Sequence, residues 1–132
     1  MVSYTHEIEV RFKDLDPLGH VNNAVVLSYL EQARFHWWKQ QLSGRRFKEE
    51  GFLLARIEVD YRRPILMEDR VIIHLHCTRV GNSSFELGYR ISRGQDGSLL
   101  AEAKSVQVMV DFATERPAPI QPEARVWLES QA

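Results

Sequence analysis

The sequence predicts an α+β domain in which one long helix covers one face of an antiparallel sheet. Three observations support this prediction: an alternating strand pattern opens the 132-residue chain, a helical repeat follows it, and four more alternating stretches fill the remainder. An element that is apolar on one side must bury that side against another element. This order of elements therefore indicates two layers, one helix on one sheet.

The first strand is expected over residues 4–12, where Ile8, Val10 and Phe12 share one face of a period-two pattern. A helix is then expected from about Asn23 to about Leu42. Its apolar residues recur at helical spacing; they are Val26, Leu30, Ala33 and Trp37. Gly44 is expected to end this helix, and residues 45–51 to form a polar connection with a short helical turn.

Four further strands are expected, separated by turns rich in glycine. Their ranges are 55–61, 71–77, 85–91 and 99–111, and each carries apolar residues at alternate positions. In the last of them Val106, Val108 and Val110 share one face. A short helix over residues 124–128 is expected near the end of the chain. One helix can cover only one face of such a sheet, and the sheet has edges, so oligomerisation is expected.

The composition excludes several classes of protein. Hydrophobic residues make up 44% of the chain, charged residues 27%, and the formal net charge is −1, which argues against a nucleic-acid-binding domain. Cys77 is the only cysteine, so no disulfide framework is possible. We find no signal-peptide pattern and no apolar run of the ~20 residues that a membrane span needs. We therefore expect residues 1–132 to form a single cytoplasmic domain.

Metal and cofactor motifs are not apparent. His74 and His76 lie two residues apart on an expected strand and so share one face, as two zinc ligands would, but no third ligand is spaced to join them. The chain has neither a glycine-rich dinucleotide fingerprint nor a P-loop. We expect no metal and no cofactor.

Polar and turn-forming residues are concentrated just before the long helix. Asp14, Asp16, His20, Asn22 and Asn23 fall within ten positions. The first amides of a helix lack intrahelical partners, and the helix dipole places roughly +0.5 charge there. Such a position favours a carboxylate or a developing oxyanion. A simple turn followed by an asparagine N-cap would account for the same residues without any chemistry.

This segment resembles the active-site segment of hotdog-fold acyl-CoA thioesterases, in the 4-hydroxybenzoyl-CoA thioesterase-like superfamily. The resemblance is closest to the long-chain acyl-CoA thioesterase branch, and it rests on Asp16, on residues 20–23, and on Glu31, Ala33 and Arg34. A second match is Val59-Asp-Tyr-Arg-Arg-Pro64. Val26 stands where that branch usually has Tyr, which implies a different substrate preference if the Tyr shapes the acyl pocket.

The resemblance implies a hotdog fold, a five-stranded antiparallel sheet wrapped around one long central helix. It also implies a homodimer or homotetramer in which two sheets pair edge to edge. The implied activity is hydrolysis of an acyl-CoA thioester to free acid and CoA. Two alternatives stay open: a non-catalytic acyl-binding hotdog module, and a hotdog thioesterase that acts on acyl-carrier-protein thioesters.

The resemblance also implies roles for individual residues. Asp16 is implied as general base or nucleophile, the backbone amide of Asn23 as the group that polarises the thioester carbonyl, and His20 as a group that orients Asp16 or water. Asn22 and Val26 are expected near the substrate.

The charged residues of the two matched segments have more than one interpretation. Arg62 and Arg63 are expected to bind CoA phosphates, although a solvated strand end or a bridge to Glu68 or Asp69 would also explain them. Glu31 and Arg34 are three residues apart on the helix. They can pair as a surface bridge or as a buried bridge near the dimer seam.

Overall fold

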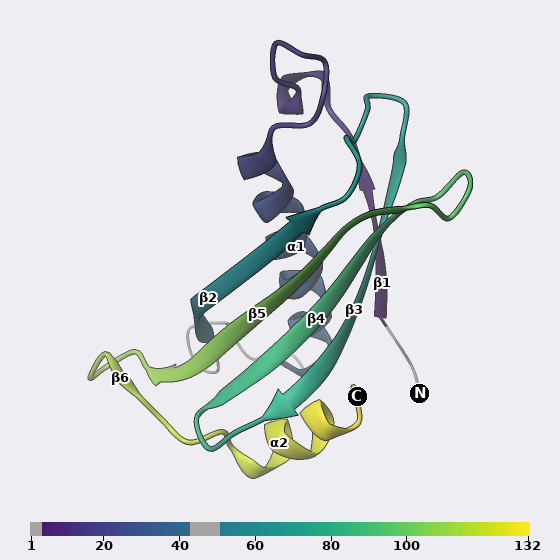
Figure 1. Ribbon diagram of the computed structural model, residues 1–132. Coiled ribbons are helices and arrows are strands. Elements are labelled where there is room, and N and C mark those ends of the chain that lie inside the picture. The colour runs from purple at the N-terminus through teal and green to yellow at the C-terminus, as the bar shows by residue number, and fades with distance from the viewer. Residues whose placement is uncertain (1–3, 43–50) are drawn as a thin grey trace.

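The computed structural model describes residues 4–42 and 51–132, in which a long helix runs across one face of a six-stranded antiparallel sheet (Figure 1). The strands are β1 (Tyr4–Glu9), β2 (Phe52–Tyr61), β3 (Arg70–Val80), β4 (Ser84–Arg93), β5 (Leu99–Asp111) and β6 (Arg116–Pro117). Their spatial order is β1-β3-β4-β5-β2, and β6 pairs with β5. The α+β class is confirmed, whereas the expected number of five strands is wrong.

The sixth strand is short and arises at the far end of β5. Val110 pairs with Pro117 and Asp111 with Arg116, after a turn in which the Asp111 carboxylate accepts a hydrogen bond from the backbone N–H of Ala113 at 2.9 Å. Proline cannot donate to a sheet, so it is found at edges of this kind. Nothing in the period-two pattern marks a two-residue strand.

The helix α1 (Asn23–Leu42) has the bounds that its apolar repeat predicts. All four residues of the predicted apolar face are at most 2% exposed; they are Val26, Leu30, Ala33 and Trp37. The expected helix stop at Gly44 and nearly all of the connection at 45–51 lie outside the described residues. None of the helices in the described ranges is long and apolar enough to span a membrane.

Aromatic rings fill the core where α1 meets the sheet. Trp38 stacks on Phe85 of β4 with ring centroids 5.4 Å apart and meets Phe52 of β2 edge-on at 5.2 Å. The second helix, α2 (Pro122–Glu129), brings Trp127 to 4.8 Å from Trp37. The short helix expected over residues 124–128 is confirmed as part of α2, which closes one end of the core below the sheet in Figure 1.

The first strand is shorter than its alternation predicts. Ile8 and Val10 are buried as expected, but Phe12 is 81% exposed because the chain leaves the sheet after Glu9 and forms a 3₁₀ turn, η1 (Phe12–Asp14). The carboxylate of Asp14 accepts hydrogen bonds from the backbone N–H and the guanidinium of Arg11, at 3.0 and 3.1 Å. This local pairing turns the chain and overrides the strand pattern.

The inner face of β5 is more polar than expected. Alternation is confirmed over residues 71–77 of β3 and 85–91 of β4, where every second residue is buried. In β5, however, the three valines lie on the less buried outer face. The inner face carries the side chains of Ala101, Ala103, Ser105, Gln107 and Met109, all of which are buried. The small and polar side chains opposite α1 therefore mark a part of the interior that is not simple apolar core.

Asp14 connects the turn before α1 to the helix itself. Its side chain is 2% exposed and accepts a hydrogen bond from the hydroxyl of Tyr29 on α1 at 2.6 Å, in addition to those from Arg11. Burial alone would raise the pKa of Asp14, but the hydrogen bonds from Tyr29 and Arg11 outweigh it, and the pKa is lowered. The same environment raises the pKa of Tyr29, through burial and then through the bond to Asp14.

We predict that Tyr29→Phe lowers the free energy of unfolding by about 1–3 kcal/mol, because it removes a donor from a buried carboxylate. The folded pKa of Asp14 lies below its unfolded value of about 3.9. The stability from this contact is therefore present above about pH 4 and is lost as the pH falls through the folded pKa. Urea unfolding at a series of acidic pH values should show the wild-type advantage shrinking. An advantage that is constant with pH would contradict this role for Asp14.

Candidate active site

A cleft of about 360 Å³ opens where the loop before α1, the start of α1 and the end of β2 meet. Six of the seven predicted site residues line it, and Asn22 does not; the six are Asp16, His20, Asn23, Val26, Arg62 and Arg63. The remaining walls come from Leu18, Val21, Tyr61, Pro64, Ile65, Leu100 and Ala101. The structure thus brings two matched sequence segments, some forty residues apart, into one cleft.

One oxygen of Asp16 is held by the backbone of its own loop. Its Oδ1 accepts hydrogen bonds from the N–H groups of Leu18 at 2.9 Å and His20 at 3.3 Å. The N–H of Asp16 donates to the carbonyl of His20 at 2.7 Å. Gly19 closes the turn with a φ of +82°, a conformation that L side chains rarely adopt. No described residue donates to Oδ2, which leaves that oxygen available to a ligand in the cleft.

Asn22 acts as the N-cap of α1. Its Oδ1 accepts a hydrogen bond from the N–H of Ala24 at 2.8 Å, and its carbonyl accepts from the N–H groups of Val25 and Val26. Among the described residues no acceptor is found for the N–H of Asn23. The capping interpretation therefore applies to Asn22, whereas Asn23 presents the open amide at the positive end of the helix dipole.

Tyr61 fixes the start of α1 from the opposite wall. Its hydroxyl donates a hydrogen bond to the carbonyl of Asn23 at 2.8 Å, which ties the end of β2 to the first residue of the helix. Burial raises the pKa of Tyr61 above the ordinary value, so the donating hydroxyl stays protonated at neutral pH. Tyr61 was not among the predicted site residues, although it lies within the matched Val59–Pro64 segment, which was the available signal.

The backbone and the ring of His20 make different contributions to this cleft. Its backbone groups hold Asp16, as described above, and its side chain lines the cleft without a hydrogen bond to any described residue. The expected contact between the His20 ring and Asp16 is therefore not formed in this structure. Val26, by contrast, is 2% exposed and contributes apolar surface to the cleft. Its contact with the substrate stays a prediction.

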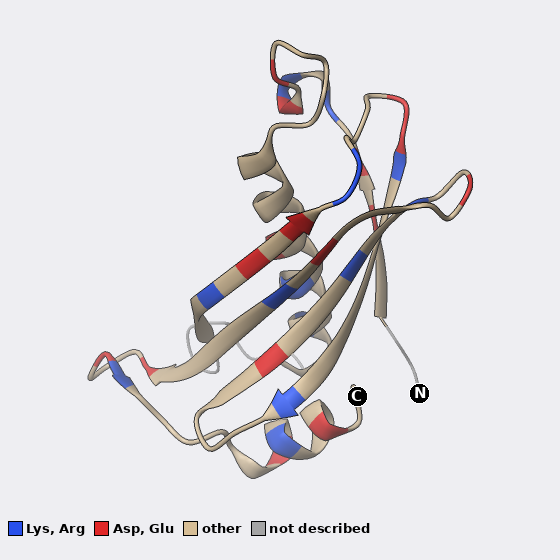
Figure 2. Ribbon diagram, viewed as in Figure 1, with Lys and Arg blue, Asp and Glu red and all other residues tan. Residues whose placement is uncertain are grey.

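The two arginines after β2 differ in their partners. Figure 2 shows the positive charge of this segment beside the end of β2. Arg62 Nη2 lies 3.1 Å from Glu102 Oε2 and 3.9 Å from Asp60 Oδ2, so its charge is largely neutralised. Arg63 is exposed and makes no ion pair with a described residue. The alternative of a bridge to Glu68 or Asp69 is wrong, because neither carboxylate forms an ion pair with Arg62 or Arg63 in the described part of the chain. The Asp69 carboxylate pairs with Arg93 at 3.0 Å instead.

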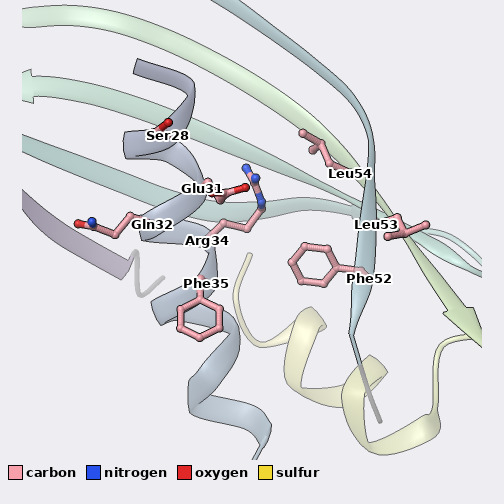
Figure 3. Close-up of a pocket in the computed structure, with 8 residues that line it drawn as sticks. All are labelled: Ser28, Glu31, Gln32, Arg34, Phe35, Phe52, Leu53 and Leu54. Atoms are coloured by element: carbon pink, nitrogen blue, oxygen red, sulfur yellow. The ribbon is translucent and has the colours of Figure 1, made fainter. Parts of the chain in front are cut away.

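A second and larger hollow, of about 600 Å³, lies between α1 and β2 (Figure 3). It is lined by Ser28, Glu31, Gln32, Arg34, Phe35, Phe52, Leu53 and Leu54. The expected bridge between Glu31 and Arg34 is wrong, since the structure places no ion pair within 4 Å between these two described residues. Instead, Arg34 is buried and donates a hydrogen bond to the hydroxyl of Tyr89 on β4 at 3.1 Å.

The two histidines weighed as zinc ligands lie on the outer face of the sheet. His74 Nε2 is 3.3 Å from the hydroxyl of Ser92, which gives it a local partner. Within residues 4–42 and 51–132, no group of three or more His, Cys, Asp or Glu side chains is placed to hold a metal ion.

Comparison with known proteins places this geometry in a family context. Residues 10–128 match the model of the Thioesterase-like superfamily. The chain is 30% identical to the long-chain acyl-CoA thioesterase FadM of Escherichia coli over 125 residues, which cover 93% of this chain and 95% of that protein. It is 26% identical to the 1,4-dihydroxy-2-naphthoyl-CoA hydrolase of Synechococcus elongatus, over 100% of this chain and 99% of that protein.

Among solved structures, a thioesterase from Thermus thermophilus in complex with coenzyme A and zinc superposes with a TM-score of 0.86. The two sequences are 38% identical, and the match covers 96% of this chain and 92% of that chain.

Proposed function

The chain belongs to the thioesterase-like superfamily and is a thioester hydrolase, and on this premise we propose that it hydrolyses an acyl-CoA thioester with Asp16 as the reacting carboxylate. The observation that carries the proposal is the pairing of two open groups in one cleft. They are the Oδ2 of Asp16, to which no described residue donates, and the backbone N–H of Asn23, for which no described acceptor is found.

The two groups have complementary tasks in thioester hydrolysis. The N–H of Asn23 donates to the thioester carbonyl oxygen and stabilises the negative charge that develops there, helped by the helix dipole. As a general base, Asp16 takes a proton from water, whose oxygen attacks the carbonyl carbon; the carbon–sulfur bond then breaks, and the proton passes to the CoA thiolate. As a nucleophile, Asp16 attacks the carbon itself, the carbon–sulfur bond breaks and CoA thiolate leaves, which gives a mixed anhydride. Water then hydrolyses the anhydride to the free acid and the Asp16 carboxylate, and the proton released passes to the thiolate.

The neighbours of these groups act as positioning residues in this proposal. The backbone amides of Leu18 and His20 hold Oδ1 of Asp16, so the carboxylate keeps one orientation. The ring of His20 lines the cleft and is free to orient the attacking water. Asn22 contributes by capping α1, and Tyr61 by holding the carbonyl of Asn23, so that the open amide keeps its place.

The substrate class is a fatty or an aromatic acyl-CoA. The relatives named above act on long-chain acyl-CoA and on 1,4-dihydroxy-2-naphthoyl-CoA. Arg63 is suited to a CoA phosphate because its charge is unpaired among the described residues. Two alternatives remain from the sequence: a non-catalytic acyl-binding module, and a thioesterase for acyl-carrier-protein thioesters. Incubation of the protein with matched CoA and carrier-protein thioesters, in the presence of a thiol reagent, separates the three.

We further propose that residues 1–132 form a single domain and that two copies of it make a hotdog-type dimer. In this dimer the two sheets pair edge to edge around their long helices. In the described part of the chain β2 pairs only with β5, so its outer edge is open. Large apolar side chains stand on this strand and on the adjoining part of α1, including Leu53 at 55% exposure and Leu54 at 43%. An open edge with apolar neighbours favours pairing with another strand.

A cytoplasmic location stays a prediction.

We predict that Asp16→Asn lowers turnover of an acyl-CoA at least ~100-fold, the low end for removal of an acid–base or nucleophilic group. The amide oxygen of Asn can still accept from the N–H groups of Leu18 and His20, so the loop and the thermal stability should be preserved. Thiol release measured under saturating substrate tests this. Near-normal turnover in the variant would refute Asp16 as the reacting group.

We predict that Arg63→Ala raises KM for acyl-CoA about fivefold, equivalent to about 1 kcal/mol for an exposed charge contact, with little change in kcat. Arg62→Ala is the matched control and should have a smaller effect, because Glu102 already neutralises Arg62. For a small thioester that lacks the nucleotide, KM should be unchanged in both variants. An equal effect of Arg63→Ala on both substrates would point to structural damage instead.

We predict that the protein is a dimer, or a tetramer of two dimers, by light scattering. Leu53→Lys places charge on the open edge of β2 and should yield monomers with reduced activity. Val126→Lys is the control, since Val126 is 71% exposed on α2, away from this edge. An active wild-type monomer would overturn the assembly proposal.

A further inference from the structure

Two histidines from different elements stack where the start of β1 meets α1. The ring centroids of His6 on β1 and His36 on α1 are 4.8 Å apart with the planes at 19°, and both side chains are half-buried. Stacking at this distance stabilises two neutral rings. Imidazole is the side chain whose ordinary pKa lies closest to neutrality. The charge of this contact therefore depends on pH in a range where the other charged side chains of the protein keep their state.

A hydrogen bond to α1 fixes the position of the His6 ring. Its Nε2 lies 3.1 Å from the side-chain oxygen of Gln32, four residues before His36 on the helix. Because this oxygen can only accept, Nε2 of His6 carries the hydrogen. A proton added to the other ring nitrogen of His6 leaves the bond in place. The contact thus tolerates a first proton, whereas a second one places two cations face to face.

No negative charge in the described part of the chain compensates a doubly charged stack. Neither His6 nor His36 forms an ion pair with a described carboxylate. Glu7, the acidic neighbour of His6, points to the opposite face of β1 and meets Arg70 at 3.4 Å. The next charged residue on α1 after the stack is Lys39, which has the same sign. Burial, and then the charges of His6 and Lys39, hold the pKa of His36 below its ordinary value of 6.5.

The other described elements packed around the stack bring no counter-charge. On β3, the residues opposite this part of β1 are the buried apolar side chains of Ile73 and Leu75. Glu31 and Arg34 of α1 line the hollow beside β2, and β2 lies at the opposite edge of the sheet from β1. Tyr4 shares the inner face of β1 and stays neutral, since burial raises its pKa further.

The strand that carries His6 is held on the domain by few contacts. β1 is six residues long, lies at one edge of the sheet (Figure 1) and pairs only with β3 in the described part of the chain. Its inner face consists of Tyr4, His6 and Ile8, of which only Ile8 is fully buried. Segments with few buried contacts open locally at low free-energy cost. The stack and the Gln32 bond are therefore a large share of what holds the start of β1 against α1.

We propose that the stacked pair of His6 and His36 is a pH-sensitive contact that holds the start of β1 on α1 at neutral pH and releases it in acid. With both rings neutral, the stack and the Gln32 bond are both present. The folded pKa of His36 lies below the value of about 6.5 that it has once the strand is released. The stability from the contact is therefore present above about pH 6.5 and is lost as the pH falls toward the folded pKa.

This inference is independent of the proposed function, because neither histidine lines the cleft of Asp16. It also differs from the acid effect at Asp14. The carboxylate of Asp14 has a lowered pKa and keeps its charge down to about pH 4, well below the range in which His36 takes up a proton.

Amide hydrogen exchange at about pH 7.5 and about pH 5 tests the proposal, with rates corrected for the intrinsic pH dependence of exchange. We expect the protection of the β1 amides to fall about tenfold at the lower pH, the change that one unit of pKa shift produces. The amides of β4, in the middle of the sheet, should keep their protection at both pH values.

Three variants assign the effect to the stack. His36→Phe keeps an aromatic ring on His6 but takes up no proton, so the fall in protection should shrink to less than about twofold. His6→Phe should give the same result and serves if His36→Phe fails to fold. His76→Gln is the matched control, because it removes a histidine from the outer face of β3, and the full fall should remain.

An NMR titration of the imidazole signals gives a second readout that a purely structural role would not move. In His6→Phe the titration of His36 should shift to higher pH, because a neighbouring positive charge is gone. Protection of β1 that is equal at the two pH values in wild-type protein would overturn the proposal. A fall of the same size in His36→Phe, or in His6→Phe, would overturn it as well.

Discussion

The buried carboxylate of Asp14 is the contact on which the arrangement of the site depends. It receives a hydrogen bond from Tyr29 on α1 and two from Arg11 in its own turn after β1, so one side chain joins this turn to the helix. Its own backbone carbonyl accepts from the N–H of Asn22, which fixes the residue that caps the helix. A charge that is 2% exposed would be costly without these donors. The neighbouring loop therefore has one favourable position relative to α1.

The two acidic residues of this loop are held differently because their surroundings differ. The carboxylate of Asp14 is enclosed and fully engaged, and its lowered pKa keeps it charged. Asp16, two residues later, uses one oxygen for the turn and leaves the other toward the cleft. The same logic separates the arginines, since Arg62 is paired with Glu102 while Arg63 keeps its charge available. In each pair, one side chain is engaged by other described residues, and the other keeps an oxygen or a charge without such a partner.

The interior beneath α1 contains a chain of buried polar side chains. In a simple two-layer domain the inner face of a central strand would be apolar, but β5 buries Ser105 and Gln107 there. These side chains satisfy one another and end at Tyr89 and Arg34, so they are consistent with the rule that buried polar groups are hydrogen-bonded. The hollow between α1 and β2 lies beside these side chains and is lined in part by Arg34.

The sequence by itself determined those features that depend on near neighbours. The bounds of α1 and the buried faces of β3 and β4 follow from apolar periodicity, which records which side of an element faces the core. The loop residues Asp16, His20 and Asn23 could be placed together because they lie within one turn and the start of one helix. Arg62, Arg63 and Val26 could be assigned to the same cleft only through the resemblance of two separate segments to one family.

Tertiary structure decided the contacts between residues that are far apart in sequence. Tyr61 reaches the carbonyl of Asn23 across 38 positions, and Arg34 reaches Tyr89 across 55. No periodic pattern encodes which partner a polar side chain finds, because that choice depends on which elements pack together. For the same reason the pairing of Arg62 with Glu102, and the absence of the expected Glu31–Arg34 bridge among the described residues, became visible only in the folded chain.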